Sequence, residues 1–189
     1  MDNTKFGTYH LTDQPQHYEV ARSNDFVFIV TDVDNILRAG ADESDTNARI
    51  EDTQKVLYYS VVSAFIPHFS QEKISVNRGN STMHFAGKPT FSDGNIVLTD
   101  FSGADTKSAI MAWQRLSGDI KNDSVGLASE YKKTCYLIER DPAGNLVRTW
   151  KLLGCWVQSI SENDFSYDDS GKRTITATIV FDRAIPEVE

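Results

Sequence analysis

Cysteine is scarce in this sequence, which contains only Cys135 and Cys155 among its 189 residues. Two cysteines give no disulfide framework, and no C-x-x-C pair of the metal-binding or redox kind occurs. We therefore expect both to be reduced, buried thiols that act as small hydrophobic side chains. The four histidines share no ligand spacing with one another or with the cysteines, so we predict neither a metal site nor a cofactor.

Long hydrophobic runs are also missing. The run VVSAFI at 61–66 falls far short of the about 20 apolar residues that a membrane-spanning helix requires. The N-terminal residues show no basic start followed by an apolar stretch, which is the pattern of a secretory signal. The sequence therefore predicts a soluble protein that is made in the cytosol.

Positive charge is in deficit, because the formal net charge is −8. This balance argues against a protein that grips nucleic acid through phosphate contacts, but not against one past which nucleic acid slides. Half of the net charge lies in residues 31–55, where seven acids face three bases and leave −4. We expect an acidic loop there, and loops of this length are usually functional or disordered.

Motifs of known enzyme classes are absent as well. The pair Gly87-Lys88 invites comparison with a phosphate-binding loop, but that loop needs a glycine where Thr82 stands and a hydroxyl where Pro89 stands. No G-x-S-x-G nucleophile motif occurs, and residues 32–40 lack the ligand pattern of a calcium loop. We predict that the protein is not an enzyme, although catalytic groups that converge from distant positions leave no such motif.

Strand signals dominate what is present. Apolar, aromatic and β-branched runs predict strands at 25–30, 55–67, 72–87 and 95–101, the second ended by a proline. The third run contains a turn signal at 77–80, so we expect it to be an extended hairpin with its tip there.

Residues 105–118 change the period to that of a helix. Apolar residues recur at helical spacing and would cover one face: Ala109, Ile110, Trp113 and Leu116. Ile110, Trp113 and Leu116 are the candidates for packing this helix against a β-core. Asp105 is the predicted N-cap, and Gly118 stands where such a helix ends.

The C-terminal third returns to strands. The turn sequence DPAGN at 141–145 separates two apolar runs, 130–140 and 146–160, and predicts a hairpin. Residues 172–183 then alternate strictly. One face carries Ile175, Ala177, Ile179 and Phe181, and the other, which we expect to be wetter, carries Thr174, Thr176 and Thr178. The predicted fold class is mainly β with one helix, in a single domain.

Three motifs in this order allow a comparison with a known family. They are F-x-G-x-x-T-F-x-D at 85–93, the helical A-W-Q at 112–114, and E-Y-K-K at 130–133, which opens a hairpin closed by G-C-W at 154–156. With the intervening segments they resemble the tail tube proteins of contractile-tailed bacteriophages, which are related to type VI secretion and bacteriocin tubes. The resemblance covers roughly residues 20–185, and it rests on fixed order and spacing.

The resemblance implies a small β-barrel or sandwich with one flanking helix. Subunits of this family join into hexameric rings, and the rings stack into a hollow tube in the virion tail, assembled in the cytoplasm of the bacterial host. Implied partners are further copies of the chain and the tail sheath, baseplate, tape-measure and tail-terminator proteins. DNA would pass through the lumen without specific binding, and no membrane is involved.

The resemblance also gives the extended hairpin a role in the lumen wall and in contact with the next ring. The candidate residues are Asn77, Arg78, Gly79, Asn80, Gly87, Lys88 and Pro89. We expect Gly87 to provide a bend and Pro89 to interrupt strand pairing. The acidic segment 32–54 departs from the family pattern as an insertion, and residues 1–19 fall outside it as a possible mobile arm.

Two other functions stay open at this point. One is the tube of a phage-like contractile system that injects protein instead of DNA. The other is a monomeric β-barrel binding module, which would show an apolar pocket and no assembly.

Overall fold

We describe a computed structural model in which residues 22–31, 55–101, 106–120, 122–167 and 171–187 are placed. The predicted N-terminal arm, the N-cap Asp105 and the acidic insertion 32–54 lie outside these described residues. The statements made about them above therefore stay predictions.

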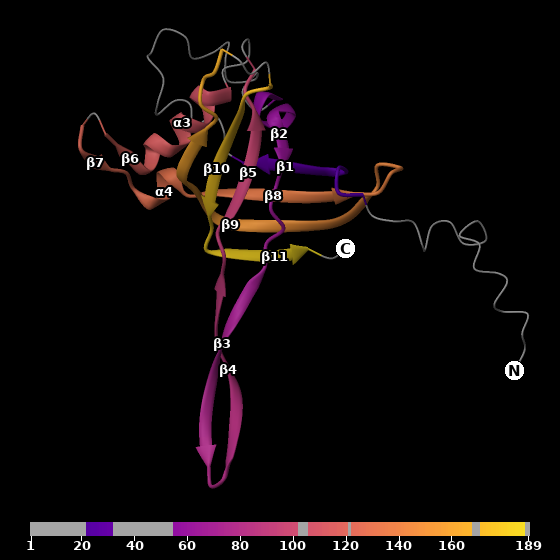
Figure 1. The fold of residues 1–189 in the computed structure, drawn as a ribbon, viewed down its shortest axis with the longest axis vertical. Coiled ribbons are helices and arrows are strands. Elements are labelled where there is room, and N and C mark those ends of the chain that lie inside the picture. The colour runs from indigo at the N-terminus through magenta and orange to yellow at the C-terminus, as the bar shows by residue number, and fades with distance from the viewer. Residues whose placement is uncertain (1–21, 32–54, 102–105, 121, 168–170, 188–189) are drawn as a thin grey trace, which may run out of the picture.

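One long strand, β9 (Leu146–Glu162), organises the sheet. Its first half pairs antiparallel with β8 (Lys133–Arg140) on one side and with β11 (Arg183–Glu187) on the other. The strand β1 (Phe26–Val30) pairs with the far side of β8. These four strands make one half of a curled sheet (Figure 1).

The second half of β9 pairs with different partners. It lies antiparallel to β10 (Thr174–Val180), which pairs with β5 (Gly94–Thr99), which in turn pairs with β2 (Val61–Ser63). The order across the described strands is therefore β1-β8-β9-β10-β5-β2, with β11 beside β9. This mainly β, barrel-like architecture is the fold class that the sequence predicted.

A glycine sits where β9 passes from one set of partners to the other. Gly154 has φ +71°, a backbone conformation that favours glycine. A Cβ atom there would lie 2.2 Å from Oδ2 of Asp182, so the position is also sterically closed. The Asp182 carboxylate is held by Lys132, whose Nζ lies 2.8 Å from it. The bend of β9 is thus supported from the side by a residue of the β10–β11 connection.

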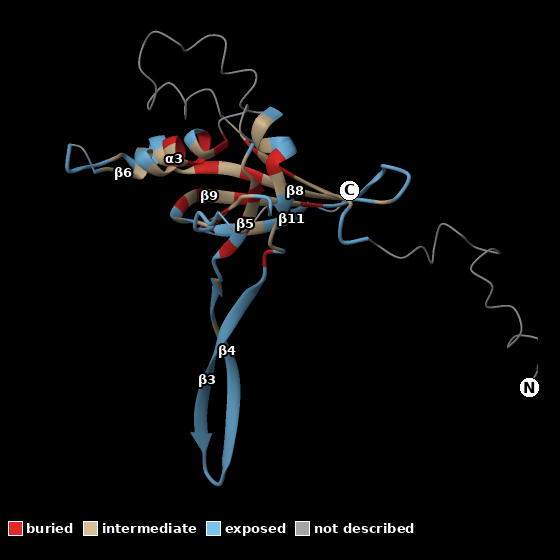
Figure 2. Ribbon diagram, turned by 45° about the horizontal axis from the view of Figure 1, so that its top comes forward, coloured by how far each residue is buried: buried red, intermediate tan, exposed pale blue. Residues whose placement is uncertain are grey.

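Alternate residues of the strands form the core between the two halves of the sheet and the helix α3 (Thr106–Ser117). In β10, Ile175, Ala177 and Ile179 are all 0% exposed, whereas the intervening threonines are half-buried. The predicted alternation of this strand is confirmed. Figure 2 shows most buried positions in the sheet and the helices, and almost none in the hairpin β3–β4.

Helix α3 lies against the sheet through the apolar face that its period indicated. Ile110 and Trp113 are each 1% exposed, and Leu116 packs against the same core. The Trp113 indole Nε1 donates a hydrogen bond to the Tyr131 carbonyl oxygen over 3.0 Å. The helix ends at Ser117, directly before Gly118, as predicted.

The prediction of a strand over 55–67 is wrong for its first part, because residues 55–60 are helical. Ser60 is completely buried, and its hydroxyl donates to the carbonyl oxygen of Val56 one turn earlier and lies 3.1 Å from the Thr106 hydroxyl. Leu57 packs against the core from this turn. Contacts with α3 therefore override the strand propensity of the tyrosines and valines.

The start of the second predicted hairpin also needs correction. Residues 128–131 form a short helix, α4 (Ala128–Tyr131), and β8 begins only at Lys133. Lys133, the first residue of β8, is buried. The sequence reading also missed β11 and two short strands, β6 (Gly118–Asp119) and β7 (Ser124–Val125).

Candidate assembly surfaces

The strands β3 (Phe69–Arg78) and β4 (Ser81–Phe91) form a hairpin that projects from the body of the molecule (Figure 1). Every residue of β3 is exposed, as are all residues of β4 except Gly87 and Phe91. An isolated two-stranded hairpin is at best marginally stable in water. Only the base of the hairpin packs within the described part of this chain, where Phe91 lies against Phe181 and the core.

The hairpin carries large apolar side chains on one face. Ile74 stands opposite Phe85, and Val76 stands opposite Met83, so the four side chains lie on the same side of the ribbon. Their exposed fractions lie between 45% and 53%. We call these four residues the apolar hairpin face. A contiguous apolar patch of this kind on a soluble protein usually marks an interaction site.

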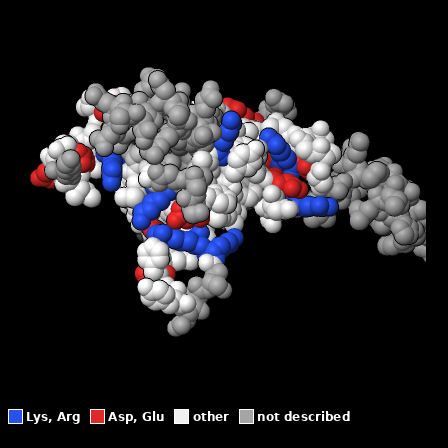
Figure 3. All heavy atoms as spheres, turned by 90° about the horizontal axis from the view of Figure 1, so that it is seen from above, with Lys and Arg blue, Asp and Glu red and all other residues white. Residues whose placement is uncertain are grey.

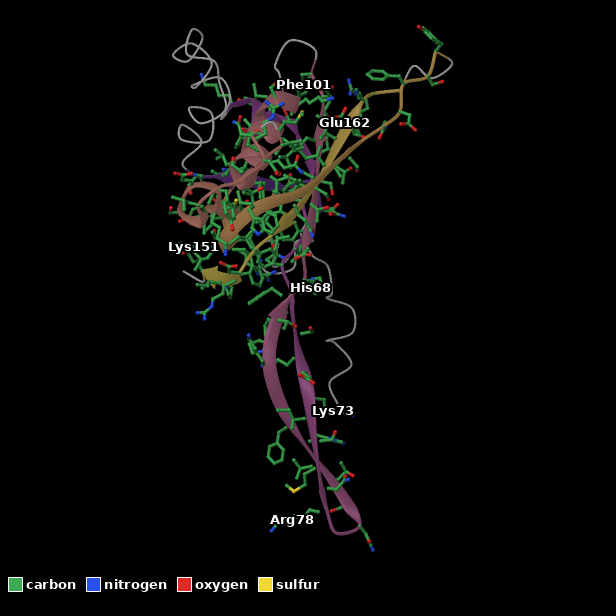
Figure 4. All side chains as sticks on the ribbon, turned by 90° about the vertical axis from the view of Figure 1, so that its left-hand side faces the viewer. His68, Lys73, Arg78, Phe101, Lys151 and Glu162 are labelled. Atoms are coloured by element: carbon green, nitrogen blue, oxygen red, sulfur yellow. The ribbon has the colours of Figure 1, made fainter. Side chains whose placement is uncertain are left out.

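The opposite face of the hairpin is polar and carries Lys73. Ser75 pairs with His84 over 3.2 Å, and the Thr82 hydroxyl donates to Asn77 Oδ1 over 3.0 Å. Figure 4 shows Lys73 at mid-length of this face, whereas Arg78 near the tip lies on the side of the apolar hairpin face, in alternation with Val76. Across residues 69–91 the charged side chains are Lys73, Arg78, Lys88 and Glu72, which gives a net charge of +2.

The seven predicted hairpin residues fall into two groups. Residues 77–80 form the tip, where Gly79 adopts φ +63° in a two-residue turn between Arg78 and Ser81. Residues 87–89 lie near the base, where Gly87 and Lys88 oppose the single residue Glu72 in a β-bulge. A Cβ atom on Gly87 would lie 2.7 Å from the Glu72 carbonyl oxygen, so the two backbones approach closely.

A second exposed surface lies between the helices α3 and α4. Residues 118–120 and 122–127, which we call the β6–β7 arm, extend sideways from the body (Figure 1). Ile120, Val125 and Leu127 are 98%, 87% and 66% exposed on this arm. The arm folds back onto the end of α3 at Gly126. A Cβ atom there would lie only 1.8 Å from the Leu116 carbonyl oxygen, so the close approach requires a residue without a side chain.

Sequence reasoning missed this arm. Its strands are two residues long, which is too short for any period to be visible. Isolated aliphatic residues in a polar segment were the only signal.

A third surface is the outward side of β5, β10 and the second half of β9. The register brings short, uncharged side chains together there: Asn95, Val97, Thr99, Ser159, Ser161, Thr174, Thr176 and Thr178. The Ser159 hydroxyl donates to the Thr178 hydroxyl over 3.1 Å. We call this surface the hydroxyl face. It contains the threonine side of β10 that the sequence predicted to be wetter.

Ion pairs connect the elements beneath these surfaces. Lys107 of α3 lies 2.8 Å from the Glu162 carboxylate at the end of β9, which also binds Arg173. Arg173 in turn lies 3.4 Å from Asp100. The hydrogen bond from Lys107 lowers the pKa of Glu162, and that from Arg173 adds to the effect. The hydrogen bond with Asp182 raises the pKa of Lys132.

The two cysteines are free and fully buried, as predicted. Burial is the main cause that raises the pKa of the Cys135 thiol, and a hydrogen bond with Cys155 raises it further. This thiol therefore stays protonated and unreactive.

Neither a metal cluster nor a membrane-spanning helix is found in the described residues. No group of three or more His, Cys, Asp and Glu side chains there is arranged to hold a metal ion. No helix among them is long and apolar enough to cross a membrane.

The acidic balance of the chain does not extend to its described residues. The described ranges contain 15 Lys and Arg residues against 13 Asp and Glu, whereas the whole chain contains 19 against 27. The excess of basic residues in these ranges equals that of the hairpin, so the rest of the described chain (Figure 3) is electrically balanced. The acidic excess belongs to the remaining segments of the sequence.

The fold is found again in tube proteins of contractile particles. The sheath–tube complex of an extracellular contractile injection system, PVC, contains a chain that superposes with a TM-score of 0.60 at 14% identity, over 94% of this chain and 98% of that one. A chain from the sheath/tube terminator of the same system superposes with a TM-score of 0.60 at 15% identity, over 90% of this chain and 98% of that one. A chain from the tube-terminating cap of the anti-feeding prophage superposes with a TM-score of 0.57 at 14% identity, over 90% of this chain and 93% of that one.

No family model and no curated protein matches the sequence. At such low identities the superpositions show the fold. The protein has the tail-tube fold, as its resemblance to tail tube proteins implied.

Proposed function

We propose that the protein is a structural subunit that assembles into rings, hexameric by analogy, and that these rings stack into a hollow tube. The single observation that carries this proposal is the hairpin β3–β4. It projects from a well-packed body, and beyond its base it exposes large apolar side chains that are not buried within the described chain. Such a hairpin is stable only when another surface covers it.

The edges of the sheet support ring formation. In the part of the chain that is described, β1 and β2 end the strand order, and each has one unpaired edge. Exposed edges invite pairing with another chain, and closure into a ring is one way to remove them. Two different edges that meet head to tail form a heterologous interface, which gives a closed ring when the rotation allows it.

The conduit has two candidate uses, DNA delivery in a phage tail and protein delivery in a contractile injection system. The fold suits both. The injection system is favoured because the superposed structures come from an extracellular contractile injection system and the anti-feeding prophage. In either use the proposed partners are sheath, baseplate and terminator proteins, and a tape-measure protein in the phage form.

Electron microscopy of the purified protein over a concentration series tests the proposed function. We expect hollow rings or tubes of uniform width. Compact monomers at every concentration, also after addition of a baseplate template, would contradict the proposal.

The hairpin's role can be tested separately with Gly87→Val. The added side chain meets the Glu72 carbonyl and should distort the bulge, so we expect shorter tubes or unstacked rings. Unchanged tube length would show that the base of the hairpin has no part in stacking.

A further inference from the structure

We propose that the apolar hairpin face of one copy docks on the β6–β7 arm of a second copy. This contact rests on the proposed self-assembly and adds to it the identity of the receiving surface. The partner is thus another copy of this chain, and the two surfaces that meet are different.

The first argument is that both surfaces are apolar and uncovered. Ile120, Val125 and Leu127 are 98%, 87% and 66% exposed within one short arm, and grouped apolar exposure of this kind marks an interaction site. The apolar hairpin face supplies aromatic, aliphatic and thioether groups of the kind that form the core of interfaces. Joining the two surfaces would remove both patches from water.

The second argument is charge complementarity. The hairpin residues 69–91 carry a net charge of +2. Residues 118–131, which contain the arm and α4, carry Asp119, Asp123 and Glu130 against Lys121, a net charge of −2. Carboxylates stand at the outer end of the arm in Figure 3. Opposite charges around an apolar centre fix the register of such a contact and disfavour hairpin–hairpin pairing.

The third argument is geometric. The arm extends sideways and the hairpin projects along the long axis of the molecule, so the two surfaces point in different directions (Figures 1 and 2). They therefore meet between copies. A contact between unlike surfaces leaves one hairpin and one arm free on every pair, so it propagates from copy to copy, as a tube requires.

Photo-crosslinking tests the contact directly. Phe85 is replaced by p-benzoylphenylalanine, and the variant is mixed with ¹⁵N-labelled wild-type chains under conditions where electron microscopy shows assemblies. After irradiation, mass spectrometry should find the cross-link between position 85 and residues 118–131 of a labelled chain. Cross-links to any other surface, or none in assembled material, overturn the docking proposal. Absence of every assembly overturns the proposed function together with it.

Charge reversal provides a second, independent measurement. Arg78→Glu, on the same side of the ribbon as the apolar hairpin face, should raise the concentration needed for assembly by about tenfold, the equivalent of about 1.4 kcal/mol. Adding Asp123→Lys on the arm and Glu130→Lys on α4 should restore most of the loss. The matched control is Lys73→Glu, which changes a charge on the opposite face of the same hairpin and should change little. If the changes on the arm and α4 fail to compensate, Arg78 faces a different partner.

Discussion

The sheet and the hairpin use the same kind of sequence for opposite purposes. In β10 every second residue is apolar and is completely buried in the core of its own chain. In β3 and β4 the apolar residues also face one side, yet about half of each side chain remains exposed. Burial of one apolar side chain contributes roughly 1.5–3 kcal/mol. The body draws this contribution from its own fold, whereas the hairpin gains it only from another molecule.

This difference separates residues that stabilise the subunit from residues that stabilise the assembly. Substitutions in the body should lower the free energy of unfolding of the monomer. Substitutions on the hairpin and the arm should leave the monomer unchanged and raise the concentration at which it assembles. The predictions below test that separation, from the largest effect to the smallest.

Trp113→Ala should have the largest effect on the monomer. The indole is almost completely buried and donates a hydrogen bond to the Tyr131 carbonyl, so its removal leaves both a cavity and an unpaired acceptor. We expect the free energy of unfolding to fall by about 3–5 kcal/mol in urea titrations. Phe85→Ala removes a comparable side chain from the hairpin and is the matched control, with an expected loss below about 1 kcal/mol. Equal losses in the two variants would remove the distinction between the regions.

Gly154→Ala should come next. The backbone there has φ +71°, and the new methyl group would meet the Asp182 carboxylate, which must move away from Lys132. A non-glycine residue in this conformation costs about 1–3 kcal/mol before the clash is counted. Gly144→Ala is the control, because Gly144 has φ +86° with no atom within 4 Å of the added group. The loss of unfolding free energy in Gly154→Ala minus the loss in Gly144→Ala measures the cost of the clash with Asp182. A difference near zero would show that the Asp182 side chain moves aside at no cost.

Ile120→Ser and Val125→Ser together should leave the monomer intact and weaken assembly. Both side chains are almost fully exposed, so their loss removes no contact within the chain. We expect an unchanged melting temperature and a concentration for assembly that rises by about tenfold or more, as is usual for residues at the centre of an interface. Leu146→Ser on β9 serves as the control, since Leu146 is an exposed aliphatic residue away from the arm. Normal assembly of the double variant would show that the arm meets a different protein or none.

The sequence could predict the elements that follow a simple period or a strong turn signal. Three such signals predicted the correct local structure. They are the strict alternation of 174–180, the helical spacing of Ile110 and Trp113, and the glycine turn at the hairpin tip. The helix at 55–60 was missed because its valine and tyrosines favour strands locally. The competing interaction is the contact between the hydroxyls of Ser60 and Thr106. These residues are 46 positions apart in sequence, so the contact is visible only in the folded chain.

The assembly surfaces were only half predictable for a related reason. The hairpin was visible because its turn and its strands are long enough to carry a pattern. The arm was not, because strands of two residues carry no period and because exposure is a property of the folded chain. The bend of β9 had one visible sign, a glycine within an apolar run, but its support by Asp182 depends on a residue 28 positions further along the chain.

The smallest expected effect concerns the ion pairs that link the helix to the sheet. Lys107 and Arg173 lower the pKa of Glu162, so the stability that this carboxylate adds is fully present above the ordinary pKa of glutamate, about 4.3. It is lost as the pH falls through the lowered pKa, where the carboxylate takes up a proton. Glu162→Gln should therefore lower the melting temperature at pH 7, and the gap to the wild type should shrink as the pH falls towards 3. Lys107→Met should reduce this pH dependence, because the hydrogen bond that lowers the pKa of Glu162 most is then absent. A gap that stays constant with pH would mean that Glu162 contributes through its shape alone, and that the helix is held to the sheet by the apolar core without help from this charge.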